Sequence, residues 1–533
     1  MYRGIWPPIL LIFVLLSGAC AKLGPDYVRP ETKVSQDWLE AGDQRLSHEP
    51  AEYRSWWQAF KDPVLDRLIG TAYRENLNLR IAGVRVLEAR AQLGVVTGNL
   101  YPQTQQATGA AEKERLSSKG LEGFANAPTN FWQSKLGLTA NWEIDFWGKF
   151  RRAIESAESG LLASVANYDN ALVSLTADVA SNYISIRTLE KRLDIARENV
   201  ETQRESLKIA EARFGGGATS QRDVEQAKTV LASTQATIPV LQTQLRQAQD
   251  ALSLLLGMPP ERLTDLSQNQ AMIPVPPPQV AVGIPLDLLR RRPDVRAAEY
   301  QAAAQCAQIG VAKAQLYPAF SLIGNFGFLS TDVNHFALGE MFQWRSRTAD
   351  AGPTLQWNIF NYGQITNNVR FQDATFQELL VAYQNSVLNA QKEVEDNLIA
   401  FLRAQEQARF LQQGAVAAAN SLNLAVIQYR EGITDFTTVL TAQQSLLSAQ
   451  DSLATARGNI SGSLVGVYRA LGGGWEIREG QDFVPPETRE AMERRTNWGK
   501  LLTPAAQTPP TPEQQKRLIR APIGKPTEKA PGT

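Results

Sequence analysis

The chain repeats itself at a fixed distance, and this duplication limits the folds open to it. The segment IDFWGKF at 144–150 returns as IFNYGQI at 359–365, 215 residues later. A recurring offset of this kind indicates two copies of one architecture. We predict repeats over 61–257 and 293–475. The same spacing joins Trp142 to Trp357, Phe214 to Tyr429, Gly217 to Gly432, Thr219 to Thr434, and Leu256-Gly257 to Leu471-Gly472, and LYP at 100–102 recurs at 316–318.

Each repeat contains a long apolar seam. From Ile154 to Phe214, apolar or small residues recur about every 3.5 positions, the period of coiled-coil helices. We predict a helix over 150–214, about 100 Å long at 1.5 Å per residue. The helical stretches 72–99 and 219–257 together match that length, so we expect them to lie end to end beside it. The equivalent helices of the second repeat are expected over 362–429 and 434–472.

Between the helical segments the period changes to two. Trp132, Leu136, Leu138 and Trp142 alternate with polar residues, which predicts a strand with one apolar and one wet face. With partner strands assigned largely by the duplication, we expect one hairpin in about 103–146 and another in 318–361. Such strands resemble part of a membrane barrel, but four strands cannot close one. The predicted class is therefore mainly α with a membrane β part shared between chains.

The two ends of the chain differ from the repeats. Residues 1–19 carry an early Arg3 and a short apolar run, which predicts a secretory signal. Small residues before Cys20 resemble a bacterial lipobox, in which that cysteine is acylated; the alternative is cleavage nearby that removes Cys20 with the signal. We expect an extended segment over 20–60, a linker over 258–292, and a remainder over 476–533 that ends in a proline-rich, disordered tail.

Composition argues against several functions. The 54 basic and 54 acidic residues leave no basic surplus, so we expect no nucleic-acid partner. Two histidines and two cysteines give little material for a metal site or nucleophile, so we predict no catalytic residue, metal or cofactor. Glu143 and Asp145 are spaced like a glycosidase pair, but we interpret them as strand residues facing a water-filled lumen. In LRRRPD at 289–294, we expect a helix to end ahead of Pro293 with its arginines near its last carbonyls, in preference to an anion site.

Four segments resemble one family, the outer-membrane efflux proteins or TolC-like channel-tunnels, in the lipoprotein branch that serves tripartite drug and metal pumps. They are LGPDYVRP at 23–30, WWQAFKDPVLDRLI at 56–69, GIPLDLLRRRPDVRAAE at 283–299 and QYREGITDF at 428–436. The resemblance implies a homotrimer with a shared 12-stranded barrel and a periplasmic α-barrel. It implies an exit duct, lipid-anchored in the outer membrane of a Gram-negative bacterium. The implied partners are outer-membrane lipid, a periplasmic adaptor and a proton-driven inner-membrane pump.

The resemblance also places the functional region at the turns between the long helices. Members commonly close this end with a ring of aspartates, where this chain has Thr438 and Thr441, and with an aromatic that Tyr429 matches. A neutral hydroxyl ring is expected to bind divalent cations weakly. Asp223 and Asp435 either restore negative charge or cap helices, and Thr219 or Ser220 is the expected N-cap after the first turn. The expected turn residues are Gly215, Gly216, Gly217, Asp223, Gly432 and Asp435.

Other functions share some of these features. A trimeric coiled-coil adhesin or spacer also has 3.5-residue seams, but it does not need two amphipathic hairpins. A periplasmic enzyme needs a polar constellation that the sequence does not show. A protein-secretion outlet shares the architecture, although the lipoprotein-like start and GIPLDLLRRRPD favour small-molecule efflux. The transported substrate is not encoded in any motif that we recognise.

Overall fold

The computed structural model describes residues 22–32, 34–35, 37–47, 49, 52–117, 129–261, 272–283, 291–333 and 338–502. The predicted signal, Cys20 and most of the proline-rich tail lie outside these residues. The principal helices are α2 (Pro63–Glu75), α3 (Leu77–Gly98), α4 (Lys149–Gly215), α5 (Gln221–Leu255), α8 (Pro293–Ala314), α9 (Gln364–Arg430), α10 (Phe436–Ala470) and α11 (Pro486–Arg495). The longer strands are β2 (Thr104–Arg115), β3 (Asn130–Glu143), β5 (Ala319–Thr331) and β6 (Arg347–Gln356).

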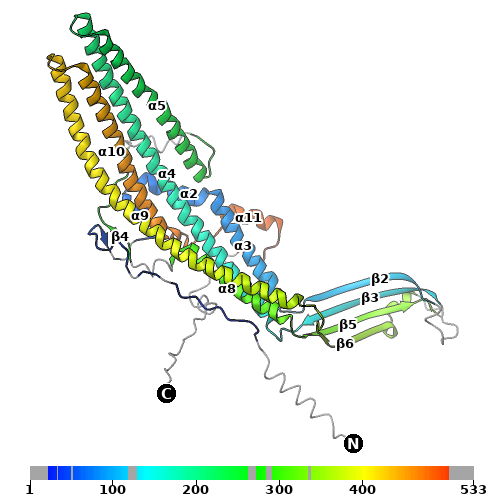
Figure 1. Ribbon diagram of the computed structural model, residues 1–533. Coiled ribbons are helices and arrows are strands. Elements are labelled where there is room, and N and C mark those ends of the chain that lie inside the picture. The colour runs from blue at the N-terminus through cyan, green and yellow to red at the C-terminus, as the bar shows by residue number, and fades with distance from the viewer. Residues whose placement is uncertain are drawn as a thin grey trace, which may run out of the picture.

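The molecule is a long helical body with a β-sheet at one end (Figure 1). The α4–α5 and α9–α10 turns form the other end, α2 and α11 lie near the middle, and α3 and α8 run from there to the sheet. Short elements are also described: strands β1 (Leu46–Ser47) and β4 (Val280–Ala281) pair in parallel, and 3-10 turns span Trp56–Phe60, Leu338–Phe342, Trp344–Ser346 and Trp475–Arg478. Within the described residues, none of the helices combines the length and hydropathy needed to cross a membrane.

The two repeats have the same helical lengths. Helices α4 and α9 each contain 67 residues, and α5 and α10 each contain 35, with both ends of each pair 215 residues apart. Each turn glycine with positive φ in the first repeat has a counterpart in the second, as with Gly217 (71°) and Gly432 (74°). The indole of Trp142 donates to the Leu100 carbonyl, and that of Trp357 to the Leu316 carbonyl. The predicted tandem duplication is therefore confirmed.

The shorter helices meet end to end beside the long ones. In the first repeat the Asn76 side chain donates to the carbonyl of Leu255, at the end of α5, over 2.9 Å. In the second repeat Arg292 donates to the carbonyl of Ala470, at the end of α10, over 2.7 Å. The equivalent N-cap residue therefore joins the helices in both repeats.

One helix expected over 72–99 is in fact two helices. Asn76 lies between α2 and α3 with extended backbone, and its side chain accepts a hydrogen bond from the Leu79 amide. An asparagine at an N-cap satisfies an amide that the new helix leaves without an intrahelical partner. The apolar period continues through the break, which is why periodicity alone did not reveal it. Asp62 caps α2 in the same way, with Pro63 as the first helical residue.

The four long strands form one antiparallel sheet in the order β2-β3-β5-β6. Directly opposite residues share a face, so the register Leu138↔Phe326 and Trp142↔Leu322 places the apolar side chains together. The opposite face carries polar residues, such as Thr139 opposite Asn325. Because β2 and β6 are both edges of this sheet, it is not closed within one chain.

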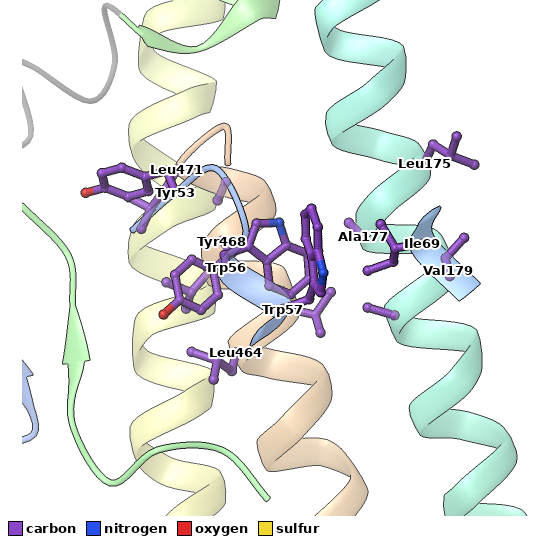
Figure 2. Packing of buried hydrophobic residues seen from close by; sticks show 14 of the residues in the cluster. Tyr53, Trp56, Trp57, Ile69, Leu175, Ala177, Val179, Leu464, Tyr468 and Leu471 are labelled. Carbon is purple, nitrogen blue, oxygen red and sulfur yellow. The ribbon is translucent and has the colours of Figure 1, made fainter. Parts of the chain in front are cut away.

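The largest apolar core lies at the middle of the body, where the N-terminal segment meets the helices (Figure 2). Trp56 is 2 % exposed and stacks on Tyr468 of α10 with ring centroids 5.2 Å apart. The C-terminal segment is anchored nearby by a buried ion pair in which Arg478 donates to both carboxylate oxygens of Asp169. Burial raises the pKa of Asp169, and the hydrogen bonds from Arg478 oppose that rise.

Two glycines of α3 test this anchoring. A Cβ at position 83 would lie 2.0 Å from the Phe483 carbonyl oxygen, whereas a Cβ at 94 has no atom within 4 Å. We expect Gly83→Ala to destabilise the folded protein by roughly 1–3 kcal/mol through overpacking. Gly94→Ala is expected to be neutral or to stabilise by about 0.5–1 kcal/mol through helix propensity. Thermal unfolding and limited proteolysis of the 476–502 segment measure both, and equal behaviour of the two variants would contradict the packing described here.

Candidate functional site at the helix tips

The first tip is built by glycines. Helix α4 ends at Gly215, Gly216 is its C-cap, and Gly217 has φ 71°. That left-handed conformation is the usual exit from a helix, and glycine adopts it without steric cost. The second tip follows the same path, with Gly432 at the equivalent position. These turn residues therefore lie where the sequence predicted.

Asp223 sits behind the first turn. Its side chain is mostly buried, and it accepts hydrogen bonds from the hydroxyls of Thr219 and Ser220. Ser220 is the N-cap of α5 by position, but its hydroxyl makes no capping bond to the backbone. The expectation that a hydroxyl caps this helix is therefore wrong in its chemistry, because both hydroxyls donate to the carboxylate instead.

Asp435 caps the second tip helix. Its carboxylate accepts from the Thr438 amide over 3.1 Å and from the Thr438 hydroxyl over 2.8 Å. These two hydrogen bonds lower the pKa of Asp435, the hydroxyl contributing most. A carboxylate with a lowered pKa contributes its stabilisation above its ordinary pKa and loses it as the pH falls through the lowered value. Of the two alternatives for Asp435, the structure supports helix capping.

The three predicted aperture residues do not share one environment. Thr438 and Thr441 are exposed, and the Thr441 hydroxyl donates to the Thr437 carbonyl over 2.9 Å. Tyr429 is 3 % exposed and packs against Phe436 with ring centroids 5.0 Å apart. The two threonines therefore belong to an exposed hydroxyl surface, whereas Tyr429 belongs to a buried pair of aromatic rings.

Arg213 links the two tips and was not anticipated from the sequence. Its guanidinium lies 4.7 Å from the centre of the Tyr429 ring and donates to the carbonyls of Tyr429 and Arg430. A cation beside the last carbonyls of a helix is favourable because those carbonyls lack intrahelical partners. The available sequence signal was a basic residue just before Phe214, the residue aligned with Tyr429.

One other sequence interpretation, that of Asp145, needs correction. Asp145 lies beyond the end of β3 and is not a lumen residue of that strand: it accepts from the amides of Phe150 and Arg151 and so caps α4. Glu143, the last residue of β3, pairs with Lys149 at 3.0 Å. A charged N-terminal turn of this kind stabilises the helix through its unpaired amides.

The segment 284–290, where we expect a helix to end ahead of Pro293, lies outside the described residues. Arg292 donates to the last carbonyl of α10 and also bonds Asp294 and Glu393. Arg291 pairs with Glu476 and lies 4.2 Å from the centre of the Tyr53 ring. Both arginines are therefore occupied by structural contacts. Among the described residues, no group of three or more His, Cys, Asp or Glu side chains is placed to hold a metal ion.

Comparison with known proteins now identifies the family. The model of the family described as outer membrane efflux protein matches residues 68–258 and again 284–473, once for each repeat. The chain belongs to this family. Its members are outer-membrane efflux proteins, which confirms the predicted location in the outer membrane and the predicted role in efflux. The chain is the outer-membrane exit duct of a tripartite efflux system.

Individual relatives cover most of the chain. The pyoverdine export outer membrane protein OpmQ of Pseudomonas putida is 32 % identical over 79 % of this chain and 88 % of its own. The toluene efflux pump outer membrane protein TtgC of Pseudomonas putida is 29 % identical, and the match covers 89 % of this chain and 96 % of TtgC. Among solved structures, the outer-membrane channel OprN matches 86 % of this chain and 100 % of its own, with a TM-score of 0.79 and 31 % identity.

The contact of Arg213 predicts a role in keeping the tips together. We expect Arg213→Ala to weaken the link between the two hairpins by roughly 2 kcal/mol, because it removes charged hydrogen bonds and a cation–π contact. Single-channel recording in planar bilayers should show an open fraction raised about 30-fold. The control is Arg204→Ala, which removes only an exposed pair with Glu201 of the same helix. An unchanged open fraction in Arg213→Ala would show that the contact does not hold the tip.

Proposed function

We propose that this duct is a homotrimer that passively conducts small organic molecules and closes at the helix tips. The observation that carries the proposal is the joining, in one chain, of an open four-stranded sheet to two helices of 67 residues each. The relatives named for pyoverdine, toluene and antibiotic export support small organic substrates. An inner-membrane pump, which we propose to be proton-driven, supplies the energy and selects the substrate.

Unpaired edges support the trimer. Strands β2 and β6 each have one unpaired edge, and lipid does not tolerate open edges, so β6 of one protomer is expected to pair with β2 of the next. Helix α9 also leaves large apolar side chains exposed in the single chain, which a neighbouring protomer would bury. These are Phe371, Val381, Leu388, Phe410, Val416, Leu424 and Ile427.

The tips offer a docking surface for a periplasmic adaptor. Ile433 is 75 % exposed at the second turn and Phe214 is 45 % exposed at the first. Exposed apolar side chains at the end of a rigid rod suit a helical partner that meets the duct end to end. Separation of the tips would then break the contacts of Arg213 and open the channel.

Electron-microscope averaging of protein extracted from the outer-membrane fraction tests the architecture. A threefold hollow cylinder well over 100 Å long is expected, since one long helix alone spans about 100 Å. A compact monomer or a solid rod would overturn the proposal. Loss of the chain from its native host should also raise sensitivity to small organic toxicants if the duct serves efflux.

The proposed aperture predicts a response to divalent cations. Thr441→Asp should introduce block by millimolar Mg²⁺, because three carboxylates around a pore bind divalent cations more strongly than hydroxyls do. The control is Thr229→Asp on α5, since Thr229 is also exposed and its hydroxyl also donates to the carbonyl four residues earlier. Conductance of the Thr441→Asp channel that stays unaffected by Mg²⁺ would place the aperture elsewhere.

The lipobox-like start predicts a lipid anchor at Cys20. Replacing Cys20 with Ala should abolish incorporation of labelled palmitate, because no thiol remains at the processing site. Trimer formation should persist, since the described packing begins after this residue. Intact-mass measurement of the mature protein provides the check, and an unmodified mature N-terminus in the unaltered protein would refute the anchor.

A further inference from the structure

At the end of the sheet where β2 ends, cationic and anionic side chains lie on opposite faces. Strand β2 ends in the sequence Glu112-Lys113-Glu114-Arg115, and successive side chains of a strand point to opposite faces. Lys113 lies opposite Trp132, which belongs to the apolar face, whereas Glu112 lies opposite Gln133 on the polar face. The two cations of β2 therefore lie on the apolar face and the two carboxylates on the polar face.

A third cation on the apolar face comes from the other edge of the sheet. Arg347, the first residue of β6, lies opposite Phe328, which in turn lies opposite Leu136. This register puts Arg347 on the same face as Lys113 and Arg115. Within the described residues, none of the three forms an ion pair, whereas the polar-face Lys135 pairs with Glu112 at 3.2 Å. All three cations are exposed.

Aromatic side chains surround these cations. The Arg347 guanidinium lies 4.4 Å from the centre of the Trp344 ring, and Trp344 is 68 % exposed. Phe342 is 67 % exposed and lies near Phe328. Aromatic rings at the end of an apolar barrel face sit at the level of lipid headgroups, and cations beside them reach the same level. Strand β2 ends and β6 begins at the end of the sheet farthest from the helical body (Figure 1), and the three cations belong to these strand ends.

We propose that Lys113, Arg115 and Arg347 bind the phosphate groups of the glycolipid that forms the outer leaflet of the outer membrane. The face that carries them is the lipid-facing face of the barrel, and the end is the extracellular end. This step rests on the trimer proposed above: where β6 of one protomer pairs with β2 of the next, Arg347 approaches the strand that carries Lys113 and Arg115 in the neighbour. Each of the three seams between protomers would thus present one phosphate-binding surface.

The test uses the purified full-length trimer and native mass spectrometry. The probes are bisphosphorylated lipid A, the same lipid with its phosphates removed, and phosphatidylglycerol. The unaltered protein should bind bisphosphorylated lipid A at least about tenfold more tightly than the dephosphorylated form. The triple variant Lys113→Gln, Arg115→Gln, Arg347→Gln should lose affinity for the bisphosphorylated form on the order of 100-fold, at about fivefold per cation.

Lys135→Gln is the matched control, because it removes a cation from the polar face of the same sheet, on the neighbouring strand β3. Its lipid affinity should stay unchanged. If the triple variant does not assemble, Lys113→Gln alone should weaken binding about fivefold. Equal binding of both lipid A forms, equal or tighter binding of phosphatidylglycerol, or full affinity in the variants would overturn the proposal. Channel conductance, measured on the same samples, shows separately whether the duct itself is intact.

Discussion

The architecture depends on one junction that occurs twice. A side chain at the N-cap of a middle helix donates to the last carbonyl of a tip helix: Asn76 to Leu255 and Arg292 to Ala470. Without a partner, that carbonyl would end a helix inside the packed body, where an unpaired polar group is costly. The bond therefore lets two shorter helices run in line beside a helix of 67 residues. It thereby fixes the tips at a set distance from the sheet.

The duplicated frame carries different chemistry in each repeat. Asp145 caps the long helix of the first repeat, but the equivalent position of the second is Phe360, which is 88 % exposed. At the tips, Asp223 of the first repeat accepts hydrogen bonds from side-chain hydroxyls. Asp435 of the second repeat accepts one from a backbone amide and so caps its helix. Duplication thus preserved the backbone path and the glycines with positive φ. The side chains at the helix ends diverged. These ends lie next to the sheet and at the tips, so the two repeats differ in side-chain chemistry at both places.

Helix limits and the duplication could be predicted from the sequence, because they follow from the apolar period and the fixed offset. Contacts between segments distant in the sequence could not. The limits of α4, Lys149–Gly215, lie one residue outside the range expected from the 3.5-residue seam. The break at Asn76 was missed because the apolar period runs through it and only capping chemistry marks it. The roles of Arg213 and Arg292 depend on carbonyls 216 and 178 residues away, and no local pattern specifies such partners. The structure of one chain shows that Thr441 is exposed. Whether Thr441 lines an aperture is decided by the arrangement of the three protomers in the proposed trimer.

Charged residues are held differently at the middle and at the tips of the molecule. At the middle, Arg478 and Asp169 form a buried ion pair. At the tips, Arg213 is held instead by backbone carbonyls and an aromatic ring. Release of this contact returns a guanidinium and two backbone carbonyls to water, which solvates them, so the cation is not left buried without a partner. In the opening that we propose, the binding energy of a docked partner has to offset the loss of these tip contacts, while the ion pairs of the middle keep the body intact.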